Sequence, residues 1–209
     1  MKTILSVTNN RINHTEGSYP MDTNLAYQEE RREELINGQV VMMAPASSSH
    51  TYVADGILSI FRHYLRGKPC IPFGDGLLVR LTDDEKFVPD VMVVCDRSKI
   101  KRTYIDGAPD LVVEVLSPGT AKNDKGYKKD VYERNGVPEY WIVNPADKSI
   151  EVYLREDGAY RLDNVYTLYP AEELAEMTEE EKAAVITEFK CHLFDDLIIC
   201  LDDIFGDLF

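Results

Sequence analysis

The stretch PDLVVEVLSP, at residues 109–118, decides the fold class of this chain. Residues 111–116 are apolar throughout except for Glu114. A continuous apolar run of this length is typical of a strand that is covered on both faces of its sheet. The run therefore predicts a buried central strand with layers packed on both sides.

The segments around this strand extend the same pattern. Further strands are predicted from apolar runs, and a lysine-rich helix closed by Gly136 is predicted over residues 123–135. The apolar runs lie at residues 77–81, 88–95 (VPDVMVVC) and 140–143 (YWIV). Together they predict an α/β domain with a restriction-endonuclease-like order of layers: a central mixed β-sheet flanked by helices on both faces.

The outer segments predict shorter elements. Residues 25–37 are typical of a charged helix that ends at Gly38. Ser47 and its two serine neighbours can cap a second helix with Val53, Ile57 and Phe61 on its inner face. The remaining predictions are a strand at 39–43, a hairpin of 150–154 with 160–162, an acidic helix after a capping box at 178–181, and a tail that is strand-like and then helical.

Length and charge limit the organisation of the chain. A chain of 209 residues suits one domain, and we expect a polar arm over 1–24, a single domain over 25–209 and an acidic C-terminal extension from about 170. The net charge of −14 argues against a protein that coats nucleic acid. However, residues 97–134 hold nine basic and six acidic side chains, so a phosphate-handling site in the middle of the chain remains compatible with this charge.

Cysteine spacing and hydropathy indicate a cytoplasmic protein. No apolar run approaches the roughly 20 residues that span a bilayer, so no membrane association is expected. The four cysteines lack CxxC spacing, which argues against structural zinc and against a disulfide framework.

Two carboxylates interrupt the apolar strands, and they are the first candidates for chemistry. Asp90 lies within the run at 88–95 and Glu114 within the run at 111–116. A bare carboxylate in a central strand costs several kcal/mol unless it is paired or binds a metal. Oxygen ligands from two neighbouring strands suit Mg²⁺ or Mn²⁺. The alternative is that each residue lies at a strand end and meets water or a lysine.

The helix after Glu114 supplies the third candidate. Asp124, Lys128 and Tyr132 follow one another at four-residue spacing and share one helix face. From that face, Lys128 can reach water on a metal held by the two strands. The alternative is a solvated lysine-rich helix.

These residues carry a resemblance to a known family. The pattern PD at 89–90, EVLSP at 114–118, Asp124 followed by Lys128 and Tyr132, and GVPEYWIV at 136–143 resembles the Uma-type restriction endonucleases of the PD-(D/E)XK nuclease superfamily. The resemblance implies that Asp90 and Glu114 are metal ligands, with the Val115 backbone carbonyl beside them.

The resemblance also assigns roles to less obvious residues. Glu34, expected on the first helix, resembles the acidic residue that many members add to the site, and its alternative is a surface glutamate. Leu116 stands where the superfamily motif has lysine, so the resemblance implies that Lys128 takes that role. His50 matches a position where the family often has histidine, and its alternative is a helix-start residue.

The function expected from this resemblance is metal-dependent hydrolysis of phosphodiester bonds in nucleic acid, with DNA as the expected substrate. The alternative is a catalytically inactive nuclease-fold module that binds nucleic acid or a protein partner. We also expect a homodimer or higher homo-oligomer, because cutting both strands of a duplex calls for two related sites. The apolar tail at 197–209 offers residues for such an interface.

Overall fold

The structure is a computed structural model, and it describes residues 32–208. Its centre is a six-stranded sheet in which β8 and β9 are parallel and all other neighbours are antiparallel. The expected α/β domain with a central mixed sheet is therefore confirmed. In spatial order the strands are β11 (Ala159–Thr167), β10 (Ser149–Glu156), β9 (Glu139–Asn144), β8 (Leu111–Val115), β6 (Val91–Val94) and β3 (Ile71–Gly74).

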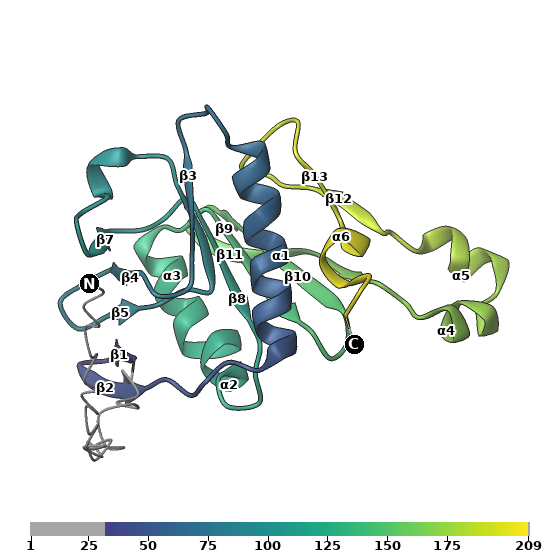
Figure 1. Cartoon of the computed structure of the whole chain (residues 1–209), viewed down its shortest axis with the longest axis horizontal. Helices are drawn as coiled ribbons and strands as arrows, with labels where there is room; N and C mark the ends of the chain where they lie inside the picture. Colours follow the sequence, from purple (N-terminus) through teal and green to yellow (C-terminus); the bar gives the residue numbers. More distant parts are fainter. Residues whose placement is uncertain (1–31, 209) are drawn as a thin grey trace, which may run out of the picture. The chain divides into compact units, whose positions relative to one another are not determined.

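One face of the central sheet is covered by α1 (Ser48–Tyr64), which lies across it in Figure 1. The helix begins as predicted, with Ser47 accepting a hydrogen bond from the backbone N–H of His50 at 3.2 Å. Val53, Ile57 and Phe61 are fully buried against this face. The short helix α6 (Leu201–Phe205) packs into the same core.

The other face is covered by a helical segment and a second sheet. The helical segment comprises α2 (Ala121–Asn123), the π-helical turn η2 (Asp124–Lys128) and α3 (Lys129–Asn135), and it ends at Gly136 with φ +86°. The second sheet has the order β2 (Gln39–Met42), β1 (Glu33–Ile36), β5 (Lys86–Phe87), β4 (Leu78–Arg80) and β7 (Tyr104–Asp106). The short turn η1 (Arg97–Lys99) precedes β7.

Strand alternation decides which face each side chain of β6 and β8 reaches. Val91 and Val113 join the core under α1, whereas Met92 and Val112 join the core under α3. Because successive side chains point to opposite faces, Glu114 shares the face of Val112. The site residues of these strands are thereby directed toward the helical segment that carries Lys128.

The predicted first helix is wrong where the structure describes it. Residues 33–36 form β1, and β1 pairs with β2 in a hairpin. Asn37 and Gly38 have φ values of +51° and +71°, the left-handed conformations that a two-residue hairpin turn of the Asn-Gly type requires. Gly38 therefore serves a hairpin and not a helix end. Residues 25–31 and the predicted arm over 1–24 lie outside the described residues.

The C-terminal part of the chain completes the core. Helices α4 (Ala171–Glu176) and α5 (Glu179–Ala184) are acidic, and Thr178 and Glu181 form the predicted capping box. The strands β12 (Glu188–Lys190) and β13 (Ile198–Cys200) then form the third sheet. Most apolar tail residues are buried under α1: Leu197, Ile199, Leu201, Ile204 and Phe205. These tail residues belong to the core, whereas Ile198 is exposed.

A disulfide elsewhere in the chain differs from expectation. Cys70 and Cys95 form a disulfide at the adjacent ends of β3 and β6, a pairing that their sequence spacing did not predict. The register Ile71 opposite Val94 brings the two cysteines together, and only the fold reveals it.

Candidate metal and catalytic site

Asp90 and Glu114 lie next to each other at the ends of neighbouring strands. The antiparallel register pairs Val91 with Val113, and its continuation sets Asp90 opposite Glu114. The backbone N–H of Val115 donates a hydrogen bond to Asp90 Oδ2 at 2.7 Å. Both carboxylates are buried, with 8% and 2% of the residue exposed. Neither carboxylate is solvent-exposed, but Asp90 lies at a strand end and Glu114 contacts Lys128, so this geometry fits the alternative of a strand-end residue that meets a lysine as well as it fits a metal ligand.

Lys128 lies among three buried carboxylates. Its Nζ atom is 2.8 Å from Glu34 Oε1, 3.4 Å from Asp124 Oδ1 and 3.5 Å from Glu114 Oε1. The residue is only 4% exposed. The alternative of a solvated lysine is therefore wrong for Lys128, whereas its neighbours on the helix behave differently.

The other lysines of this helical segment point elsewhere. Lys125 is paired at the surface with Glu151, at 2.6 Å. The Lys129 ammonium lies 3.9 Å from the centre of the Tyr153 ring. Leu116 packs at the margin of the core under α3. Among these positions, only Lys128 brings a cation to the buried carboxylates.

The buried charges shift one another's ionisation. Burial by itself lowers the pKa of Lys128, but Glu114, Glu34 and Asp124 outweigh burial and raise this pKa overall. Burial raises the pKa of Glu114 well above its ordinary value, and Lys128 opposes that shift only in part. The pKa of Asp124 is raised by burial in the same way. Lys128 thus stays protonated, and the raised pKa values of Glu114 and Asp124 mean that these two carboxyl groups hold a proton more readily than usual.

The π-helical turn places Asp124 and Lys128 on the inner side of the helix. Both are buried, and the Tyr140 hydroxyl donates a hydrogen bond to the Asp124 carbonyl at 3.0 Å. One turn later, the Tyr132 hydroxyl donates to Glu114 Oε1 at 3.0 Å. Single π turns often occur at functional sites. The four-residue spacing of Asp124, Lys128 and Tyr132 is confirmed as one face directed at Glu114.

Glu34 reaches the site from a strand and not from a helix. It is 6% exposed, and its Oε1 atom also accepts the backbone N–H of Val88 at 2.9 Å. The alternative of a surface glutamate is therefore wrong. Glu85 fixes the hairpin turn beside it, because Glu85 accepts hydrogen bonds from the Asn37 N–H and from Arg134.

His50 is a neighbour of Asp90. Its Nε2 atom is 3.2 Å from Asp90 Oδ2, and its side chain is 12% exposed. Burial lowers the pKa of His50, but the hydrogen bond and charge of Asp90, with smaller contributions from Asp75 and the Val115 backbone, raise it overall. As the alternative predicted, the backbone of His50 lies in the first turn of α1. Its side chain nevertheless faces the site. The family resemblance, in which this position often holds histidine, was the signal in the sequence.

These residues suit a hard divalent cation that binds together with its substrate. Asp90, Glu114 and the Val115 carbonyl are all oxygen donors, the type of ligand that such a cation prefers. Within residues 32–208, no group of three or more His, Cys, Asp or Glu side chains is arranged so that it could hold a metal ion. Mg²⁺ commonly uses one or two carboxylates together with substrate phosphates, so two protein carboxylates are a sufficient set.

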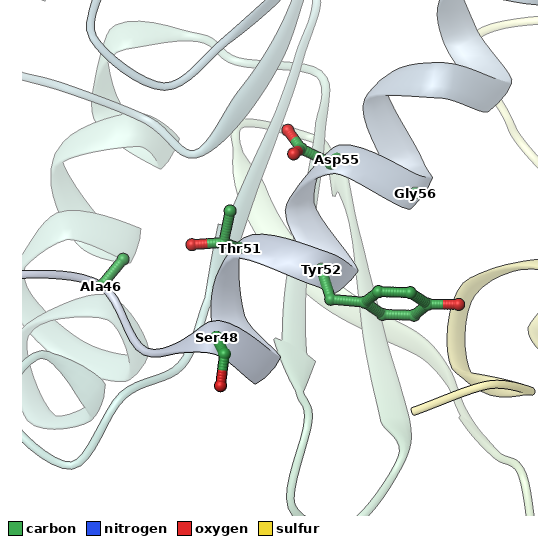
Figure 2. A pocket seen from close by; sticks show the side chains of 6 residues that line it. All are labelled: Ala46, Ser48, Thr51, Tyr52, Asp55 and Gly56. Atoms are coloured by element: carbon green, nitrogen blue, oxygen red, sulfur yellow. The ribbon is translucent and has the colours of Figure 1, made fainter. Parts of the chain in front are cut away.

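A separate groove runs beside the first turns of α1. It encloses about 650 Å³ and is lined by Ala46, Ser48, Thr51, Tyr52, Asp55 and Gly56. Figure 2 shows these side chains, with Tyr52 directed toward the yellow C-terminal segment. None of the predicted site residues lines this groove, so we place the chemistry at the buried cluster.

Comparison with known proteins identifies the family of the chain. Residues 21–184 match the Uma2 family, which is described as a family of putative restriction endonucleases. The chain belongs to the Uma2 family. The fold is therefore restriction-endonuclease-like, and the family is one of putative nucleases.

The chain is also similar to one curated protein in sequence and to one solved structure in fold. Over 137 residues, the chain is 31% identical to the uncharacterized protein slr1290 of Synechocystis, covering 64% of this chain and 72% of the relative. The fold of this chain is similar to that of a solved structure from Anabaena variabilis, which is described as a putative nuclease belonging to DUF820. That similarity has a TM-score of 0.65, with 17% identity, and covers 89% of this chain and 96% of the other. No helix among residues 32–208 is long and apolar enough to cross a membrane.

Proposed function

We propose that this Uma2-family chain is a metal-dependent endonuclease that hydrolyses phosphodiester bonds in DNA. The observation that carries the proposal is the meeting of Asp90 and Glu114 on adjacent strands with Lys128 from the following helix. These residues are far apart in sequence and are all buried. Burial of three carboxylates around one ammonium, with Asp90 next to Glu114, is costly for folding alone, and it is explained if a cation and a phosphate complete the site.

The roles of the residues follow from their contacts. Asp90, Glu114 and the Val115 carbonyl would hold Mg²⁺ or Mn²⁺. When bound, such an ion polarises the phosphate and lowers the pKa of water. Lys128 is held protonated by its carboxylate neighbours, so it acts as a fixed positive charge or hydrogen-bond donor toward the reacting phosphate and not as a base. Tyr132 orients Glu114 through its hydroxyl, and His50 orients Asp90.

The net charge of the protein fits this proposal. An acidic site repels phosphate until a divalent cation reverses the local sign. The helical segment also presents Lys125 and Lys129 on its outer side, close to the site in sequence but not part of it. DNA is the proposed substrate because the family description is that of restriction endonucleases. We also retain the proposal that the protein self-associates.

A second candidate function is a non-cleaving module that binds nucleic acid or a protein partner. It is favoured by one observation: the Lys128 ammonium already contacts Glu34, Glu114 and Asp124, and so satisfies part of their charge without any metal. In that case the cluster is a structural ion network, and no cation is required.

A cleavage panel separates the two candidates. The purified protein is incubated with single-stranded and duplex DNA and RNA, in Mg²⁺, in Mn²⁺ and in chelator. We expect cleavage of DNA only with a divalent ion, and none from Glu114→Gln. Glu139→Gln, which changes a buried carboxylate outside the site, is the matched control. Absence of cleavage of every substrate, with the nucleic acid still bound, would favour the non-cleaving module.

A further inference from the structure

The outer strand of the β1–β2 hairpin, β2, forms an unusually apolar sheet edge. All four residues of β2 are exposed, and β2 is the outermost strand of its sheet. Val40, Val41 and Met42 are 61%, 36% and 45% exposed, so three of the seven large exposed apolar side chains among residues 32–208 lie in succession here. We refer to Gln39–Met42 as the β2 edge. Within the described part of the chain, no strand pairs with its outer side.

Apart from its length of four residues, the β2 edge lacks the features that usually protect an edge strand. Natural edges carry charged residues, proline or a bulge, because unpaired backbone groups invite another strand. The segment QVVMMAPA, at residues 39–46, contains no charged residue, and its proline follows the strand. The β1–β2 pairing also runs without a bulge. A regular, uncharged and apolar edge is therefore available for strand addition.

We propose that the β2 edge pairs antiparallel with the β2 edge of a second copy of this chain. An antiparallel pair of identical strands is two-fold symmetric, so each strand must tolerate itself as a neighbour. The β2 edge meets this condition, because uncharged side chains oppose one another in any register near Val40 and Val41, whereas like charges would destabilise the pair. The absence of cations also makes this edge a poor surface for phosphate groups.

The pairing would place two candidate sites close together. Glu34 lies on β1 directly opposite Val41 of β2. In the order β1–β2–β2′–β1′, the two β1 strands are three strand spacings apart, or roughly 14 Å. This spacing applies to the Glu34 residue of each site, because Asp90, Glu114 and Lys128 lie on other elements; the pairing thus relates the two sites by a two-fold axis, as cleavage of both strands of a duplex requires. This consequence rests on the proposed nuclease function, whereas the strand pairing does not.

Sedimentation velocity of the full chain at micromolar concentrations tests the pairing. We expect a dimer for the natural sequence, and for Val40→Lys an increase of about 10-fold in the dimer dissociation constant, because a charge is introduced on each strand of the pair. Val165→Lys is the matched control: Val165 is 46% exposed on β11, the outermost strand of the six-stranded sheet. We expect this control to remain dimeric.

Further arms keep the pairing falsifiable. Met42→Glu should dissociate the dimer as Val40→Lys does, so one poorly folded variant does not decide the outcome. A natural chain that is monomeric throughout, or a dimer that survives both substitutions, would overturn the proposal. So would dissociation by Val165→Lys alone. Because no nucleic acid is present, a protein without nuclease activity would still give a decisive result about the pairing.

Discussion

The Lys128 ammonium lies 2.8 Å from a carboxylate oxygen of Glu34, and this contact joins the second sheet to the helix that follows β8. Glu34 Oε1 also accepts the N–H of Val88, two residues before Asp90. The contact therefore connects three separate segments of the chain at the candidate site. Under the proposed function, Lys128 takes the role of the lysine that is absent from position 116, and this contact holds its ammonium in the site.

Lys128→Ala should lower the cleavage rate on the order of 10²-fold or more, because it removes a fixed positive charge from the reacting phosphate. Metal binding should persist, since lysine is not a ligand. Lys125→Ala and Lys129→Ala are matched controls, because their side chains contact Glu151 and Tyr153 at the surface. Single-turnover cleavage kinetics measure the effect. Natural rates in Lys128→Ala together with loss of activity in either control would show that the catalytic lysine is assigned wrongly.

Lys128→Met should destabilise the fold by an amount that grows with pH. Removing one partner of a buried ion network costs about 3 kcal/mol or more. Without Lys128, the raised pKa values of Glu114 and Asp124 should rise further, so the folded state holds protons that the unfolded state releases. Folding stability then falls as pH rises above the ordinary carboxylate range. Urea unfolding at about pH 5 and about pH 8 checks this. An equal loss at both pH values would contradict it.

Glu114→Gln should leave the stability of the metal-free protein unchanged or higher. Burial raises the pKa of Glu114, so its ionised form costs folding free energy near neutral pH, and glutamine removes that cost while still accepting from Tyr132. Glu139→Gln provides the contrast. The Glu139 carboxylate accepts from the Leu193 N–H and the Trp141 indole, so losing one acceptor should cost about 1–3 kcal/mol. Chemical unfolding compares them. A large loss in Glu114→Gln would favour a structural role.

The His50 imidazole should titrate above its ordinary pKa of about 6.5 in the metal-free protein. Burial lowers this pKa, but Asp90 reverses the direction. Protonated His50 therefore stabilises the fold at low pH, and this contribution is lost as pH rises through the folded-state pKa. NMR titration of the histidine ring protons should show the raised value, and a lower one in Asp90→Asn. An unchanged value in Asp90→Asn would exclude Asp90 as the cause.

Much of the fold and site could be predicted from the local sequence pattern. The buried strands were predicted because apolar runs specify strands with two covered faces, and Asp90 and Glu114 were noticed because they interrupt those runs. Helical spacing predicted that the side chains of Lys128 and Tyr132 share one face of the helix and point toward the sheet. These features depend on neighbours within a few residues.

The remaining features depend on contacts between distant segments. Glu34 was assigned to a helix because the charged run at 28–34 favours one, whereas the Asn37–Gly38 turn and pairing with β2 and β5 make it a strand. The Cys70–Cys95 pairing follows from the β3–β6 register. Part of the apolar tail was expected to form a dimer interface. No sequence pattern shows that most of these residues pack in the core with α1.

The most direct test of the central claim is Mn²⁺ binding measured by titration calorimetry on the metal-free protein. We expect Mn²⁺ to bind the natural protein and Lys128→Met. We expect no Mn²⁺ binding by Asp90→Asn or by Glu114→Gln. Asp196→Asn, which changes an exposed carboxylate paired with Lys68, should bind as the natural protein does. Equal binding by the natural protein and by both Asp90→Asn and Glu114→Gln, or no binding by any of them, would contradict a metal site held by these two carboxylates.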